Sequence, residues 1–135
     1  MALQAIHWAY TEGRVSAVIP HLKRQLGGYL STYGRIHIGA TTDPGVTAQQ
    51  YARQGFDKVV MVYKSAWPGA ARSVERRLNQ AAHAWRFTTT VDSPAAGGEE
   101  LPSGRAAYFV FLAVGPRASA EGAYHAAGIT ERQVA

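Results

Sequence analysis

Three side chains in the middle of the chain carry groups that could do chemistry together. His37 stands in a short run of β-type sequence, and an imidazole can take a proton from water near neutral pH. Glu75 lies between Val74 and Leu78 of an apolar helical stripe, so its carboxylate should point to the rim of the core, where a cleft would form. Arg72, about one helical turn earlier, could add a guanidinium.

His37 and Glu75 each have an ordinary structural interpretation as well. His37 could be a strand residue that faces solvent. Glu75 could be an exposed helical residue that pairs with Arg72 or Asn79. The sequence leaves both interpretations open.

The elements that would position these groups follow from hydrophobic spacing and from turn residues. Asp43 can cap a helix that has Pro44 at its first position, and Gly55 can end that helix. Pro20 suits the first turn of another helix, which the pair Gly27-Gly28 could break. The patterns predict helices near residues 20–33, 44–54 and 68–85, inner strands near 35–40, 57–64 and 106–114, and further strand candidates at 3–10 and 86–91.

These elements predict one α/β (α+β) domain with a small mixed β-sheet flanked by helices. We expect the domain to cover residues 1–115 and residues 116–135 to form a tail, either a frayed helix or disordered. The Pro/Gly/Glu-rich segment 93–104 is long for a connection inside a compact domain, which indicates a mobile or functional loop.

The composition indicates a soluble cytoplasmic protein. The chain has 135 residues, no cysteine, no apolar run long enough for a membrane span and no signal-like start. Its 14 Lys and Arg exceed its 9 Asp and Glu, giving a net charge of +5. A basic body favours nucleic acid as a partner, although this charge is also ordinary for a small domain. The cations that could follow a nucleic-acid backbone, or merely face solvent, are Arg53, Lys64, Arg72 and Arg76.

The order and spacing of the segment from Arg35 to Leu78 resemble the GIY-YIG nuclease domain. The segment runs from a strand with His37-Ile38-Gly39 through a turn at Asp43 and a helix to a second strand, and it ends in a helix that carries Glu75. The resemblance covers about a third of the chain. It implies a metal-dependent DNA endonuclease that hydrolyses phosphodiesters with one divalent cation, Mg²⁺ or another.

The resemblance also assigns roles to particular residues. His37 takes the first position of the second triplet and would act as base, and Glu75 would hold the metal. The first motif tyrosine, on a strand adjacent to that of His37, would be Tyr10, or Tyr29 if residues 27–37 form a hairpin. Tyr51 occupies a position where the family often has histidine or tyrosine.

The chain departs from the family at the helical arginine, because Thr47 stands at that position. Arg53 is on another side of the same helix and cannot simply replace it. Arg35 or Arg72 could supply the guanidinium from another element. Without one, the charge on the phosphate would be poorly neutralised and cleavage slow.

Two other functions stay open. The chain could be a catalytically degenerate member of the fold that binds nucleic acid or another protein, such as an accessory protein of a phage or mobile element. It could also be an interaction module with no role on nucleic acid. An arginine within reach of Glu75 and His37 would favour the nuclease, and cations gathered on one face would favour nucleic acid.

Overall fold

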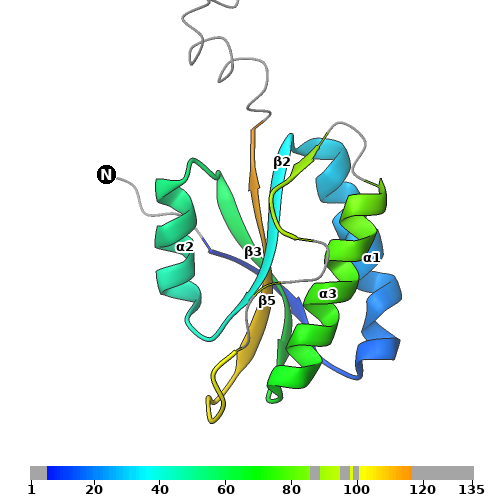
Figure 1. Cartoon of the computed structure of the whole chain (residues 1–135), viewed down its shortest axis with the longest axis vertical. Coiled ribbons are helices and arrows are strands. Elements are labelled where there is room, and N and C mark those ends of the chain that lie inside the picture. Colours follow the sequence, from blue (N-terminus) through cyan, green and yellow to red (C-terminus); the bar gives the residue numbers. More distant parts are fainter. Residues whose placement is uncertain (1–5, 86–88, 95–97, 99–100, 117–135) are drawn as a thin grey trace, which may run out of the picture.

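A computed structural model describes residues 6–85, 89–94, 98 and 101–116. The chain forms a mixed sheet with helices on both faces (Figure 1). Its helices are α1 (Val15–Thr32), α2 (Pro44–Arg53) and α3 (Pro68–Trp85), and its strands are β1 (Ile6–Thr11), β2 (Arg35–Thr41), β3 (Lys58–Ser65), β4 (Thr90–Val91) and β5 (Tyr108–Gly115). The predicted fold class is therefore confirmed. No helix of the described residues is long and apolar enough to cross a membrane.

The last strand of the chain lies in the middle of the sheet. The strand order is β1-β3-β5-β2-β4, with β5 antiparallel to both β3 and β2. The outer pairs, β1 with β3 and β2 with β4, are parallel. The connection from β1 to β3 passes through α1, β2 and α2, and that from β2 to β4 passes through α2, β3 and α3, so both are long crossovers of the kind that parallel strands need.

The sheet has a larger core on one face and a smaller one on the other. Helices α1 and α3 pack together over the first face, where Ile36, Val60 and Leu112 are fully buried (Figure 1). Helix α2 alone covers the second face and buries Met61, Phe111 and Ala113 against Ala48 and Tyr51. Because successive strand residues alternate between faces, odd and even positions of β2 belong to different cores.

Most boundaries lie within a few residues of the sequence-based expectation, and α1 differs most. It begins at Val15, so Pro20 lies inside the helix and not in its first turn, and Gly27-Gly28 does not break it. Its stripe of Val18, Leu22, Leu26 and Leu30 is buried along the whole length. This burial offsets the weak helix propensity of the proline and the two glycines.

Three other expectations need comment. The strand candidate at 86–91 is only the two-residue β4, and residues 86–88 lie outside the described part. The segment 93–104 is described at 93–94, 98 and 101–104. The predicted tail lies outside the described residues from 117 onward.

Candidate functional site

His37 faces α2, where its ring packs beside two aromatic rings that also touch each other. Its ring centroid is 4.9 Å from that of Tyr51, and it stacks on Phe111 at 6.3 Å with an interplanar angle of 13°. Two residues along β2, Gly39 makes room for the Phe111 ring, because a Cβ at that position would lie 2.7 Å from the Phe111 Cζ. The three rings form a compact cluster beneath α2.

Burial controls the protonation of this cluster. Desolvation lowers the pKa of His37 from its ordinary value of 6.5, Asp92 partly opposes the shift, and Arg35 adds to it. Desolvation also raises the pKa of Tyr51, with smaller contributions from the carboxylates of Glu75 and Asp92. At neutral pH the cluster therefore holds a neutral imidazole and a protonated phenol.

Thr47 is buried within the contact between α2 and the sheet. Its hydroxyl donates to Thr41 Oγ1 at 2.7 Å, and the same oxygen of Thr41 accepts the backbone N–H of Asp43 at 3.0 Å. The hydroxyl of Thr47 thus helps to fasten the first turn of α2 to the end of β2. The position expected to carry an arginine is filled by a small side chain in a closed contact.

Glu75 belongs to α3, which packs on the opposite face of the sheet from α2 (Figure 1). The residue is only 2% exposed. Its Oε2 accepts the backbone N–H of Gly98 at 2.8 Å, and its Oε1 lies 3.6 Å from Arg72 Nε. Oε1 has no hydrogen-bond partner among the described residues. Burial raises the pKa of Glu75, while the Gly98 N–H, Arg72 and Arg76 lower it by less.

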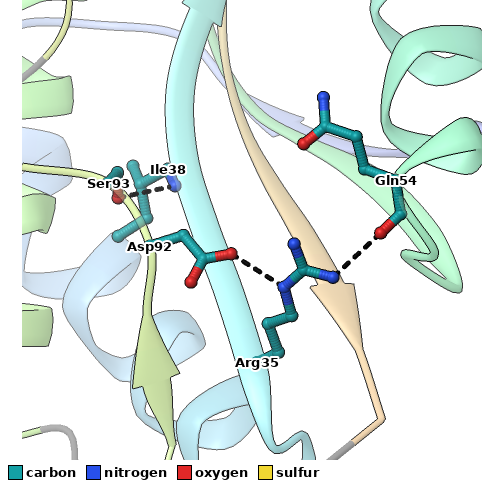
Figure 2. Close-up of polar contacts among 5 residues, drawn as sticks. All are labelled: Arg35, Ile38, Gln54, Asp92 and Ser93. Carbon is teal, nitrogen blue, oxygen red and sulfur yellow. Dashed lines mark hydrogen bonds and ion pairs between the residues drawn. The ribbon is translucent and has the colours of Figure 1, made fainter. Parts of the chain in front are cut away.

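Side chains close the outer edge of β2 beyond its short pairing with β4. Ser93 Oγ accepts the N–H of Ile38 at 3.0 Å (Figure 2) and donates to Asn79 Oδ1. Asn79 Nδ2 in turn donates to the carbonyl oxygens of Ile38 and Glu75, at 3.3 and 3.1 Å. Asn79 therefore bonds backbone carbonyls of β2 and α3, and the Glu75 carboxylate pairs with Arg72 and not with the Asn79 side chain.

Arg35 is held at the other end of β2 (Figure 2). Its Nε donates to Asp92 Oδ2 at 2.7 Å, and its Nη1 donates to the carbonyl oxygen of Gln54 at 2.9 Å. Its guanidinium also lies 4.0 Å from the centroid of the Phe56 ring. These contacts join β2, the end of α2 and the segment after β4. The guanidinium of Arg35 therefore has a structural role.

Neither candidate for the first motif tyrosine lies on a strand next to that of His37. Tyr29 is part of α1, so the hairpin alternative is wrong, and its ring stacks near that of Tyr33 at 6.0 Å. Tyr10 is on β1, which β3 and β5 separate from β2. The adjacent strand is β5, which places Ala113 opposite His37 and Phe111 opposite Gly39. Phe111 is the site residue that sequence reasoning missed, and it has no hydroxyl.

The four predicted nucleic-acid contacts lie on three separate parts of the molecule. Arg53 is exposed in the last turn of α2. Lys64, on β3, has its Nζ within 5.5 and 5.9 Å of the ring centroids of Tyr10 and Phe109. Arg72 and Arg76 line an open cleft of about 480 Å³, together with Pro68, Gly69, Leu101 and Ser103.

The described residues do not fit the Mg²⁺ that the resemblance implies. Within these residues, no group of three or more His, Asp or Glu could hold a metal ion. Glu75 offers a single carboxylate, of which one oxygen already accepts an N–H and the other faces a guanidinium. Mg²⁺ requires oxygen ligands in near-octahedral geometry, and a neighbouring cation opposes its binding. Comparison of the chain with family models, curated proteins and solved structures finds no match.

Proposed function

We propose that this chain is a nucleic-acid-binding protein with a GIY-YIG-like arrangement of elements and an incomplete catalytic centre. The observation that carries this proposal is Thr47, whose hydrogen bond to Thr41 closes the position of the expected arginine. Phe111 supports it further, because the strand beside His37 brings no tyrosine hydroxyl into the ring cluster. A phosphodiester transition state at this position would lack the guanidinium that neutralises its negative charge.

The remaining candidate groups are already engaged. Arg35 is bonded to Asp92 and Gln54, and the Glu75 carboxylate is enclosed by Gly98 and Arg72. By contrast, Arg53 and Arg76 are exposed and form no ion pair within the described part of the chain, so they can meet phosphates. The net charge of +5 favours a polyanion, and a chain without cysteine suits the reducing cytoplasm, where DNA or RNA would be met.

Binding to a fluorescent DNA duplex, followed by anisotropy over a range of salt concentrations, tests this proposal. Affinity should fall steeply as salt rises, because phosphate contacts release counterions. Arg53→Gln and Arg76→Gln should each reduce the slope of log K against log salt by about 1. Arg24→Gln, an exposed change on α1, is the matched control. No binding at low salt, or a flat salt response, would overturn the proposal in favour of a protein partner.

The second candidate is the active endonuclease, and one observation favours it. Burial raises the pKa of Tyr51 and the Glu75 carboxylate adds to the shift, so the two groups lie within electrostatic range although they belong to opposite faces of the sheet. Mg²⁺-dependent nicking by the wild type that Glu75→Ala abolishes would establish this candidate. The binding proposal expects no nicking by the wild type or by Thr47→Arg, because one arginine leaves Phe111 and the enclosed Glu75 unchanged.

A further inference from the structure

The face of the sheet that carries α2 is covered only in part. Along β5, Phe111 is buried beneath α2, whereas Phe109, two residues earlier on the same face, is only half-buried. Trp8 and Tyr10 on β1 are 55% and 38% exposed. Lys64, directly opposite Phe109 on β3, completes what we call the aromatic face: Trp8, Tyr10, Lys64 and Phe109.

The three rings of the aromatic face are arranged edge to face. Trp8 and Tyr10 lie 5.9 and 6.0 Å from Phe109, and 6.4 Å from each other, with interplanar angles between 70° and 80°. Lys64 Nζ lies 5.5 Å from the centroid of Tyr10 and 5.9 Å from that of Phe109. Neighbouring strands thus hold three large rings and one ammonium group in fixed relation on an open surface.

No helix or strand of the described residues covers these rings, which are partly exposed. Large exposed apolar patches on a soluble protein mark interaction sites. The Lys64 ammonium beside Tyr10 and Phe109 suits an anionic occupant, as does the net charge of +5. An occupant that combines flat rings with negative charge satisfies both features.

We propose that the aromatic face binds single-stranded nucleic acid, whose bases stack on Trp8, Tyr10 and Phe109 while Lys64 contacts a phosphate. Stacking of unpaired bases on aromatic side chains beside cations is the general physics of single-strand recognition. A duplex keeps its base faces stacked inside and cannot use these rings. The inference rests on the proposed function and specifies the strand state that this face selects.

Affinity for a labelled oligothymidylate and for a duplex of equal length tests the inference. Trp8→Ala should raise the Kd for the single strand about tenfold or more, in the range typical of a lost base–aromatic stack. Tyr10→Ala should act in the same direction, and Lys64→Gln should weaken binding and lower its salt dependence. The Kd for the duplex should change by less than about twofold in Trp8→Ala, because paired bases do not reach the rings.

Trp85→Ala is the matched control. Trp85 is also a partly exposed tryptophan beside a lysine, with Lys23 Nζ 6.0 Å from its ring, but it lies at the end of α3. It should leave the single-strand Kd unchanged. Single-stranded DNA should also quench tryptophan fluorescence in the wild type and in Trp85→Ala, and quench it less in Trp8→Ala.

Three results would overturn the inference. The first is a single-strand Kd that Trp8→Ala does not change, and the second is an equal loss for single strand and duplex. The third is a wild-type dimer in sedimentation that Trp8→Ala dissociates without loss of single-strand affinity, since the face would then join two copies. If the duplex still binds with a steep salt dependence, only this inference fails. If neither nucleic acid binds at low salt, the proposed function fails with it.

Discussion

His37 illustrates how a residue with catalytic potential can serve the packing of the protein. Its half-buried ring packs beside those of Tyr51 and Phe111, and burial lowers its pKa below the ordinary 6.5. A weaker base is less able to take a proton from water, and no carboxylate bonds the imidazole among the described residues. The geometry therefore favours a role for His37 in holding α2 against the sheet.

The lowered pKa of His37 should be visible in the stability of the protein. The unfolded chain protonates this residue more readily than the folded chain does, so its stabilising contribution is present above about pH 6.5. That contribution is lost as pH falls through 6.5 toward the lower pKa of the folded state. His37→Phe, which keeps a flat ring, should remove this part of the pH dependence of the free energy of unfolding.

Urea unfolding of wild type and His37→Phe across mildly acidic to neutral pH would measure this effect. The comparison cancels the other histidines, which both proteins share. A wild type that gains stability relative to the variant as the pH drops would contradict the assignment, because it would mean that the fold favours the imidazolium.

Glu75 should show the opposite pH dependence. Burial raises its pKa in the folded state, so its contribution to stability is greatest below the ordinary value of 4.5 and is lost as pH rises through the raised value. Glu75→Gln keeps an oxygen for the Gly98 N–H and removes the buried charge. The variant should therefore gain stability over the wild type as pH rises from acidic to neutral.

Thermal unfolding of Glu75→Gln, with the exposed Glu12→Gln as control, would check this expectation. Added Mg²⁺ should leave the wild-type Tm unchanged, because the described residues near Glu75 offer no metal site. A Tm that rises with Mg²⁺ in the wild type and not in Glu75→Gln would show instead that this carboxylate binds the ion.

At the scale of elements, local patterns in the sequence predicted much of the fold. The helix at 68–85 coincides with α3, and the Asp43 cap is present, with its Oδ1 accepting the N–H of Val46 at 3.1 Å. Cap chemistry and apolar period are local, so one sequence suffices to find them. The position of β5 between β2 and β3 depends on long-range pairing, which no local pattern encodes.

The candidate site was predictable to the same extent as the elements. His37 and Tyr51 lie in contact, on the strand and the helix that the sequence predicts for them. The sequence alone does not single out Phe111, because the strand beside His37 comes from the far end of the chain. Whether Glu75 and Arg35 would be free or engaged depends on Gly98, Asp92 and Gln54, which are distant in sequence.

Gly39 and Gly27 occupy different environments: a side chain at the first would clash, and a side chain at the second would not. Gly39→Ala would place a Cβ 2.7 Å from Phe111 Cζ, so the ring must shift and the unfolding free energy should fall by about 1–3 kcal/mol. A Cβ at Gly27, inside α1, meets nothing within 4 Å. Gly27→Ala should therefore stabilise the protein, by about 0.5–1 kcal/mol.

Chemical denaturation of both variants would measure these opposite effects. Near-ultraviolet circular dichroism should change only in Gly39→Ala, where the aromatic cluster is disturbed. Equal effects of the two substitutions would argue against a tight contact between β2 and Phe111.

At the scale of the whole molecule, the two faces of the sheet differ in how they are covered. One face is sealed by α1 and α3 over the larger core. The other is covered by α2 at one end and leaves Trp8, Tyr10 and Lys64 open at the other. The ring cluster of His37 and the aromatic face are parts of this second surface. The proposed binding of single-stranded nucleic acid therefore belongs to the open side of the sheet and does not require a working catalytic centre.

One measurement tests the central claim, which is binding without cleavage. Supercoiled plasmid is incubated with wild-type protein and Mg²⁺ at low salt, and gels are run before and after the protein is removed. We expect the plasmid to be retarded in the first gel and to run as intact supercoiled DNA in the second. Nicked or linear product that requires Mg²⁺ and disappears with Glu75→Ala would contradict the claim, as would a plasmid that the protein does not retard.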